Sequence, residues 1–303
     1  MTPLCNRREA MQLGAGLIVG AGLSQVRADE KKKRTIHKAI MYGTFSYGRG
    51  GPKGSPPALS LAERFKALKA AGFEGVEPNS HMNQAEVKNA LEESGLKAAS
   101  VCCDTHWGKP LSSPVERIRR EGIEGLEQSL KDAKFYGASS VLFVPGRVIE
   151  GQISYDDCFR RAVAGIRQAV PVAKDLGVKI AIENVWNEFI TTPQQAMSLL
   201  DAIDSPMVGW HFDVGNAIRY GPSEKWVPVL GKHILKLHIK EFSHLKGFGV
   251  KLLEGDDHWP AIMHALDEIG YDGWGISEQP GEQAKDEASL LDLSKRMDKV
   301  FAS

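Results

Sequence analysis

The chain has 303 residues, of which 42% are hydrophobic and 25% charged, a balance typical of a globular protein with a large core. Its 38 lysines and arginines equal its 38 aspartates and glutamates, which argues against a polyanion-binding surface and hence against nucleic acid as a partner. Beyond the N-terminal segment no apolar run has the length that spans a membrane, so we expect no stable membrane insertion of the mature protein.

The N-terminal segment has the order of a secretory signal. Arg7 and Arg8 precede an apolar, glycine-rich stretch at residues 11–23, and Ala28 offers a small residue before a cut. The arginine pair resembles a twin-arginine signal, although the flanking residues meet that consensus loosely. We therefore expect a signal peptide at residues 1–28, a charged linker at residues 29–35, and a periplasmic or secreted protein. An uncleaved anchor or a disordered tail, and with it a cytoplasmic location, is the alternative.

From residue 36 onward, short β-rich runs alternate with longer amphipathic stretches, in eight pairs. We expect strands at residues 38–44, 73–77, 97–103, 139–144, 178–183, 207–213, 233–240 and 273–278. Glycines occupy five of the helix-to-strand joints, where a helix often ends in a left-handed residue, at Gly72, Gly95, Gly137, Gly177 and Gly270. Such alternation is typical of a parallel sheet covered by helices.

The number of pairs favours an α/β fold of the (β/α)8 TIM barrel type, as a single domain over residues 36–303. A doubly wound sheet seldom needs so many pairs and usually carries a phosphate-binding glycine loop. The glycine-rich residues 48–54 are interrupted and followed by prolines, so we expect them to form the first loop between strand and helix instead.

Polar residues close the otherwise apolar strands. In a barrel the C-terminal strand ends converge on one site, so these residues are the candidates for chemistry. They are Glu77, His106, Glu183, Asn184, His211, Asp213, His238, Lys240 and Glu278.

Glu183, Asp213, His238 and Glu278 come from four successive strands and offer three carboxylates and one imidazole. Each alone could cap a helix or form an ordinary buried hydrogen bond. Together they are hard to explain as caps, because burying three carboxylates without a cation is costly. We expect one divalent metal ion, with Mn²⁺ or Mg²⁺ preferred for this oxygen-rich set and Co²⁺ or Zn²⁺ as alternatives.

The motifs resemble the xylose isomerase-like barrels, a family that includes sugar phosphate isomerases and epimerases; within it, the L-xylulose-5-phosphate 3-epimerases are the most similar group. The resemblance covers residues 38–300. It rests on GFEGVEPNS, SVCCDTHWGKPL, IAIENVWNEF, GWHFDVGN, LKLHIKEF, LEGDDHW and GYDGWGISEQ.

This resemblance implies that the four candidate ligands hold a catalytic metal and that Glu183 and Glu278 also act as acid and base. It implies that Glu77, His106 and His211 contact substrate hydroxyls. The expected activity is epimerisation or isomerisation of a carbohydrate through an enediolate. Dimers are common in the family, so a homodimer is compatible with it.

Two features leave the substrate open. His244 stands where related ketose epimerases have an arginine, and Lys240 could bind a phosphate or oxyanion or pair with Glu241 or another carboxylate. Export would favour a free or oxidised sugar over a sugar phosphate. A 3-keto-glycoside lyase or hydrolase using the same metal site is the second enzyme hypothesis.

Two further classes are less favoured. An AP endonuclease of the endonuclease IV type shares the barrel, but this chain has Asn216, Lys251 and Leu253 where additional zinc ligands would be needed. A non-catalytic sugar-binding barrel could use its tryptophans for stacking, although such residues usually serve packing. The tryptophans concerned are Trp107, Trp186, Trp210 and Trp259.

Two local expectations concern loops and cysteines. We expect Asp257 to cap the last helical stretch, with closure of the site by the loop at residues 252–259 left open. Asn187 and Glu188 should lie in a loop above the site. Cys102 and Cys103 are adjacent in an expected strand and so point to opposite faces, which predicts no disulfide between them.

Overall fold

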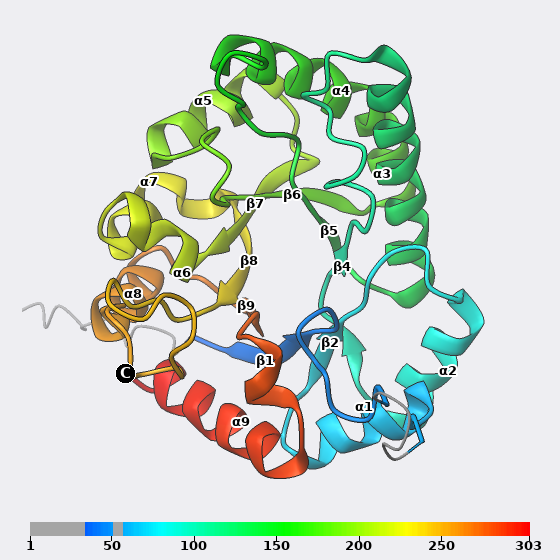
Figure 1. Cartoon of the computed structure of the whole chain (residues 1–303), viewed down its shortest axis with the longest axis vertical. Helices are drawn as coiled ribbons and strands as arrows, with labels where there is room; N and C mark the ends of the chain where they lie inside the picture. Colours follow the sequence, from blue (N-terminus) through cyan, green and yellow to red (C-terminus); the bar gives the residue numbers. More distant parts are fainter. Residues whose placement is uncertain (1–33, 51–56) are drawn as a thin grey trace, which may run out of the picture. The chain divides into compact units, whose positions relative to one another are not determined.

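The computed structural model describes residues 34–50 and 57–303. Within these residues, parallel strands form a ring that the helices surround (Figure 1). The architecture is a TIM barrel, as the alternation of strands and helices predicts. The expected signal peptide and residues 29–33 of the expected linker lie outside the described residues.

The ring contains nine strands because the expected third strand is interrupted. The strands are β1 (Ile36–Met41), β2 (Gly75–Glu77), β3 (Lys97–Ala98), β4 (Val101–Cys102), β5 (Ser140–Phe143), β6 (Lys179–Glu183), β7 (Val208–Asp213), β8 (Ile234–Ile239) and β9 (Gly273–Ser277). The strand β3 pairs only with β2, and β4 pairs only with β5, so the two short pieces together fill one barrel position. The eight expected strands are thus all present.

The helices lie on the outside of this ring. The α-helices are α1 (Leu61–Ala70), α2 (Gln84–Ser94), α3 (Glu116–Tyr136), α4 (Tyr155–Leu176), α5 (Pro193–Ile203), α6 (Val214–Ala217), α7 (Trp226–Leu230), α8 (Trp259–Glu268) and α9 (Glu287–Phe301). Four short 3₁₀ helices, η1 (Ile218–Tyr220), η2 (Ser223–Lys225), η3 (Gly231–His233) and η4 (Gly281–Ala284), complete the described elements.

Helix ends follow the sequence signals. All five predicted glycines have positive φ, between 66° and 93°, and three of them are themselves the C-terminal caps of α2, α3 and α4. At the start of α1, the Ser60 hydroxyl accepts the Glu63 N–H while the Glu63 carboxylate accepts the Ser60 N–H. The described part of the glycine-rich segment lies between β1 and α1, as expected; residues 51–56 lie outside the described residues.

Alternate strand residues face two different environments. Trp210 and Phe212 on β7 point outward into the core between strands and helices. His211 and Asp213, which alternate with these two residues along β7, are also fully buried and reach the barrel interior. Cys102 and Cys103 divide in the same way, between an inner cluster and the outer core, and both are free thiols.

The N-terminal edge of the barrel includes part of the expected linker. The Arg34 guanidinium contacts the Asp267 carboxylate and donates to the Phe301 carbonyl at 2.8 Å and the Ser303 carbonyl at 3.0 Å. The Thr35 carbonyl accepts the Gly273 N–H. The barrel therefore begins by Arg34, two residues earlier than the sequence indicates. Among the described helices, none has the length and apolarity to cross a membrane.

Candidate metal centre and active site

The four predicted metal ligands come together at one end of the barrel. Glu183 and Asp213 are the last residues of β6 and β7, His238 lies near the end of β8, and Glu278 directly follows β9. One ligand atom from each of the four lies within 4.8 Å of the others. Nδ1 of His238 is 2.9 Å from Oε1 of Glu183, 3.3 Å from Oε2 of Glu278 and 3.7 Å from Oδ2 of Asp213. We call these four residues the metal cluster.

The donor atoms of the metal cluster fit a divalent cation. Oδ1 of Asp213 accepts the Asn216 N–H at 2.6 Å, whereas Oδ2 is buried and has no hydrogen-bond partner among the described residues. The Asp213 and His238 side chains are fully buried, and those of Glu183 and Glu278 are 6% and 20% exposed. Buried carboxylates are stable when paired or bound to a metal. Three carboxylates with one imidazole form a donor set suited to Mn²⁺ or Mg²⁺ and acceptable to Zn²⁺ or Co²⁺.

Lys240 pairs with two of these carboxylates. Its ammonium group donates to Oε2 of Glu278 at 2.8 Å and lies 3.6 Å from Oδ2 of Asp213. Burial lowers the pKa of Lys240, but the Asp213 and Glu278 carboxylates outweigh burial and raise it above its ordinary value. Of the roles that the sequence left open, the geometry favours pairing, although with ligand carboxylates and not with the adjacent Glu241.

Neighbouring charges give Glu183 and Glu278 different proton affinities. Burial raises the pKa of Glu183 to about 8, against the opposing attraction of His238. Burial also acts to raise the pKa of Glu278, but Lys240 and His238 outweigh it and hold this pKa well below its ordinary value. Two carboxyl groups with divergent pKa values on one site are suited to acid and base roles.

Asn184 fixes the backbone that carries Asp213. Its Oδ1 accepts the Asp213 N–H at 3.0 Å and the Trp210 Nε1–H at 3.2 Å, and its Nδ2 donates to the Asp213 carbonyl at 2.8 Å. The sequence identifies Asn184 as a strand-end polar residue but does not reveal this contact, because its partners are on the neighbouring strand. We assign it a positioning role.

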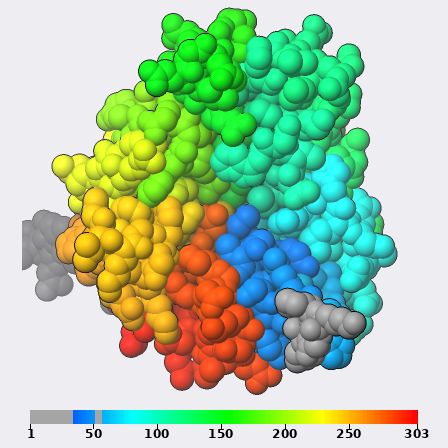
Figure 2. Space-filling model, in the orientation of Figure 1, coloured from blue at the N-terminus to red at the C-terminus, as the bar shows by residue number. Residues whose placement is uncertain are grey.

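A cavity of about 400 Å³ opens beside the metal cluster. Its lining comprises Met41, Asn79, Cys102, Cys103, Asp104, His106, Trp107, Leu142, Glu183, Val185, Trp186, Asn216, Lys240, Phe248 and Glu278. In Figure 2 the segments that follow β1, β8 and β9 meet around the middle of the face shown. Both candidate acid–base residues therefore reach a space in which a small molecule could bind.

His106 lines this cavity as an uncharged ring. Its Nδ1 accepts the Val144 N–H at 3.3 Å, which places the ring proton on Nε2. Burial lowers the pKa of His106 to about 4, so the ring is neutral at physiological pH. Its geometry is compatible with the predicted contact to a substrate hydroxyl.

Glu77 and His211 lie elsewhere. Both are fully buried in the barrel interior, and neither lines the cavity. The Glu77 carboxylate accepts Nε2–H of His238, at 3.0 Å between heavy atoms, and lies 3.9 Å from Nδ1 of His211. Their predicted contact with substrate hydroxyls remains a prediction that this geometry does not favour.

The four tryptophans considered for sugar stacking divide into two pairs. Trp107 is 52% exposed and Trp186 is half-buried, and both line the cavity. Trp210 and Trp259 lie in the hydrophobic core, where they cannot stack on a ligand. The distinction depends on which way each side chain faces, which sequence proximity to a strand end does not reveal.

The predicted capping role of Asp257 is wrong. The residue at the N-cap of α8 is His258, which makes no side-chain capping bond. The Asp257 carboxylate instead accepts the Ser223 hydroxyl at 3.1 Å and the Phe242 N–H at 3.2 Å. The Asp257 carboxylate therefore connects the segment after β8 with η2. These long-range hydrogen bonds form in place of the expected local cap.

Two polar residues of the cavity wall were not predicted from the sequence. Asn79 follows β2 and Asp104 follows β4, within motifs on which the resemblance rests. Oδ1 of Asn79 is buried without a hydrogen-bond partner among the described residues. The signal that could have identified them is their position just past a strand end. Asn187 and Glu188 lie in the loop after β6, as predicted, and Glu188 pairs with Arg219 at 3.2 Å.

Comparison with known proteins gives a consistent picture. Residues 65–299 match the family described as xylose isomerase-like TIM barrel. The chain is 24% identical over 264 residues to L-ribulose-5-phosphate 3-epimerase UlaE of Escherichia coli O157:H7, covering 82% of this chain and 92% of that protein.

Solved structures share the fold. D-allulose 3-epimerase from Methylomonas sp. has a TM-score of 0.71 at 19% identity, over 88% of this chain and 97% of the other. The 3-keto-D-glucoside 4-epimerase YcjR from E. coli has a TM-score of 0.71 at 17% identity, over 89% and 100%. These three similar proteins are sugar epimerases, enzymes of the isomerase class. The chain belongs to the xylose isomerase-like TIM barrel family.

Proposed function

We propose that the protein is a divalent-metal-dependent sugar epimerase or isomerase that moves a proton on the carbon next to a ketose carbonyl. The observation that carries this proposal is that Glu183 and Glu278 belong to the metal cluster and also line the cavity. A protein that only binds sugar has no need for two acid–base groups at such a place. The sugar epimerases among its relatives support the same reaction class.

When bound, the cation would supply Lewis-acid polarisation of the carbonyl and the adjacent hydroxyl. One of the two glutamates removes the C–H proton to leave an enediolate, and the other returns a proton. Return to the opposite face of the same carbon gives epimerisation, and return to the neighbouring carbon gives isomerisation. Both glutamates line the cavity beside the metal cluster, so either could remove the proton while the other returns it.

The cavity walls favour an uncharged sugar over a sugar phosphate. Among the described residues that line the cavity, Lys240 is the only lysine or arginine, and Glu278 already engages it. A phosphate would also meet Asp104, which is exposed on the same wall. Export through the expected twin-arginine-like signal, to the periplasm or outside, would agree with a free sugar, because sugar phosphates are kept in the cytoplasm.

A 3-keto-glycoside is the second candidate substrate. The fold shared with a 3-keto-D-glucoside 4-epimerase supports it. In a lyase or hydrolase reaction the same glutamate would remove the proton next to the keto group, and the glycosidic oxygen would leave from the next carbon. The two hypotheses therefore share the first step and differ in the product.

The test uses purified protein with Mn²⁺ in deuterated water and a panel of free ketoses, their phosphates and 3-keto-glucosides. We expect wild-type protein to exchange the C–H proton next to the carbonyl, as followed by NMR. Glu183→Gln and Glu278→Gln should lower turnover by about a thousandfold or more, since each removes an acid–base group. Glu188→Gln, an exposed carboxylate in the loop after β6, is the matched control and should remain active.

The product separates the alternatives. An epimer or an aldose supports the proposed function, whereas a released aglycone assigns the keto-glycoside reaction. No exchange with any substrate of the panel, in protein shown to contain metal, would contradict the proposal.

A further inference from the structure

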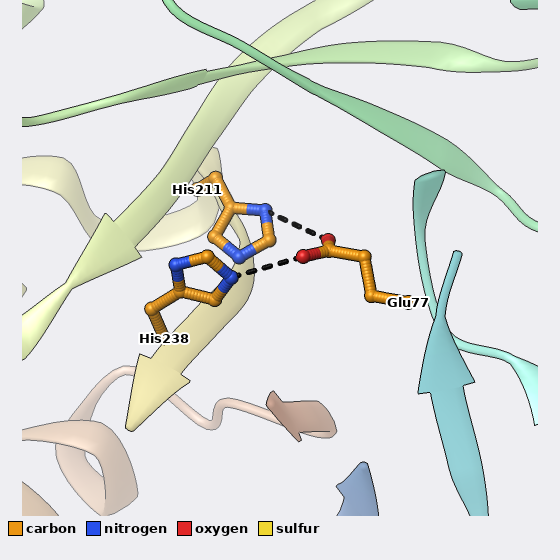
Figure 3. Close-up of side chains that lie close together, drawn as sticks. All are labelled: Glu77, His211 and His238. Carbon is orange, nitrogen blue, oxygen red and sulfur yellow. Dashed lines mark hydrogen bonds and ion pairs between the residues drawn. The ribbon is translucent and has the colours of Figure 1, made fainter. Parts of the chain in front are cut away.

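The imidazole of His238 is held from both sides. Its Nδ1 faces the carboxylates of the metal cluster, with the Glu183 oxygen at 2.9 Å. Its Nε2, on the opposite edge of the ring, lies 3.0 Å from Oε2 of Glu77. Figure 3 shows the Glu77 side chain reaching from β2 across the barrel interior toward His238 and His211. Glu77 is thus the only described carboxylate in hydrogen-bond contact with the edge of His238 that faces away from the cluster.

A histidine that binds a metal must present an unprotonated nitrogen to it, so its proton resides on the other nitrogen. In such sites a carboxylate or carbonyl that accepts this proton's hydrogen bond fixes the tautomer and the ring orientation, and it makes the ligand more basic. Glu77 is placed to do this for His238, because a bond from Nε2–H leaves the Nδ1 lone pair directed at the cluster.

The position of Glu77 excludes the simpler roles. Its side chain is fully buried and absent from the cavity lining, so it does not contact a molecule bound in the cavity. Its backbone is fixed by the register of β2 with β1, where Glu77 is opposite Met41, and by a bond from the Tyr42 N–H to its carbonyl. The only hydrogen bond of its carboxylate among the described residues joins Oε2 to His238 on β8, and Oε1 has no hydrogen-bond partner among them.

We propose that Glu77 is a positioning residue that accepts the Nε2–H of His238 and thereby directs Nδ1 of that ring toward the metal. This inference rests on the metal site of the proposed function. In this arrangement Glu77 would bond to His238, and His238 would bind the cation. Glu77 itself would contact neither the cation nor the substrate. Removing the Glu77 carboxylate should weaken metal binding without changing the cavity wall.

The first test measures Mn²⁺ binding to wild type, Glu77→Gln and Glu77→Ala by titration calorimetry and by the electron paramagnetic resonance signal of free Mn²⁺. We expect affinity to fall about tenfold in Glu77→Gln, which keeps an acceptor oxygen but loses the charge, and about a hundredfold in Glu77→Ala. Activity of both variants should recover at high Mn²⁺, with the substrate KM close to that of wild type. A merely structural role would not give rescue by metal.

The matched control is Glu74→Gln. Glu74 also forms a carboxylate–histidine pair, with Nδ1 of His37 at 2.7 Å, but both side chains are about half-exposed and lie at the N-terminal ends of β1 and β2, opposite the strand ends that carry the metal cluster. The Glu74→Gln variant should bind Mn²⁺ with the affinity of wild type. Wild type that binds no divalent ion would contradict the proposed function, whereas wild-type affinity in Glu77→Ala would overturn this inference alone.

A measurement on the unaltered protein covers the case in which the variants do not fold. In the Zn²⁺-loaded wild type, long-range ¹⁵N–¹H correlation spectra report which nitrogen of His238 carries the proton. We expect Nε2–H. A proton on Nδ1 would overturn the inference, as would two metal ions per chain with one lost in Glu77→Gln, because Glu77, His211 and His238 would then be a second cation site.

Discussion

Two groups of buried carboxylates lie on neighbouring segments of this barrel and differ in how their oxygens are satisfied. In the metal cluster, Oδ2 of Asp213 has no hydrogen-bond partner among the described residues. In the second group, which we call the loop cluster and which consists of Glu241 and Asp257, every carboxylate oxygen accepts a hydrogen bond from the protein. Oε2 of Glu241 accepts from the Leu253 N–H and the Trp259 Nε1–H, both at 2.7 Å.

The remaining bonds of the loop cluster complete this contrast. Oε1 of Glu241 accepts the Asp257 N–H at 3.1 Å, and both oxygens of Asp257 accept bonds from Ser223 and Phe242. The protein therefore supplies all partners for the loop cluster, which folds the segment after β8. It leaves Oδ2 of Asp213 in the metal cluster without a donor, an oxygen that a bound cation would satisfy. For these two clusters, burial alone does not separate the structural carboxylates from the candidate ligands, whereas the number of protein donors does.

The largest expected effect on stability comes from the loop cluster. Glu241→Ala leaves buried N–H donors without partners and should lower the free energy of unfolding by about 3 to 5 kcal/mol. Urea unfolding followed by circular dichroism measures the change. Glu254→Ala is the control, because Glu254 is a half-exposed carboxylate whose one ion pair among the described residues is with Arg296. The folded variant should keep wild-type Mn²⁺ affinity. A tenfold loss of that affinity would erase the distinction between the clusters.

The metal cluster could be predicted from the sequence better than the loop cluster. Parallel strands of a barrel end at one face, so Glu183, Asp213 and Glu278 could be placed together from their positions alone. The partners of Glu241 and Asp257 could not, because they come from loops whose conformation no motif specifies. Asp257 illustrates the difference: its place before α8 predicts a cap, yet tertiary contacts determine its bonds.

The direction of side chains inside the barrel was the second feature that the sequence did not predict. The sequence identifies Glu77 as a strand-end carboxylate, but whether it faces the cavity or the interior depends on the register between strands. The split of the third strand into β3 and β4 was also not predicted, because the break between Ala98 and Val101 reflects pairing of the two pieces with different neighbours. Fold class, the eight barrel positions and the four candidate ligands could therefore be predicted, whereas the supporting contacts could not.

His106 provides a third kind of buried polar group, one that is neutral. Its folded-state pKa of about 4 lies below the ordinary value of 6.5, so the unfolded chain binds this proton first. Its contribution to stability is present above pH 6.5 and is lost as pH falls toward 4, by about 3 kcal/mol. His106→Gln should lack this loss. Urea unfolding from pH 7 to 4 measures it, and His264→Gln, at an exposed histidine of α8, controls for the removal of a histidine.

If wild type and His106→Gln lose stability in parallel over this range, the folded protein does not lower the pKa of His106. The ring would then accept a proton at Nδ1 as readily as in the unfolded chain, against its assignment as the acceptor of the Val144 N–H.

Metal removal should affect only the metal cluster, in which Oδ2 of Asp213 has no hydrogen-bond partner among the described residues. Mn²⁺ at a hundred times its Kd should stabilise the folded protein by about 2.7 kcal/mol, because the unfolded chain does not assemble the site. For a domain of this size that raises Tm by about 5 to 10 °C, and a chelator should reverse it. Asp213→Asn should lose the increment, whereas Glu188→Gln should keep it. An increment that survives in Asp213→Asn would place the cation outside the metal cluster.

The smallest expected effect concerns Trp107, an exposed residue of the cavity wall that belongs to neither cluster. Trp107 is 52% exposed at the cavity and packs edge to face against His106. Trp107→Ala should lower the free energy of unfolding by about 1 kcal/mol, because about half of the residue is in solvent and its main packing contact is with His106. If the ring contacts substrate in both ground and transition states, KM should rise about fivefold with kcat nearly unchanged. Phe135→Ala, at an exposed aromatic of α3 outside the cavity lining, is the control.

The same variant also tests whether the strand-end glutamates alone orient the reacting carbon. A large fall in kcat for Trp107→Ala would show that the exposed wall orients the reacting carbon, and not only the glutamates that are fixed by strand ends. An unchanged KM would instead assign Trp107 to solvent and leave Trp186 and Phe248 as the aromatic contacts of the cavity. Either result separates what the barrel positions rigidly from what its loops add.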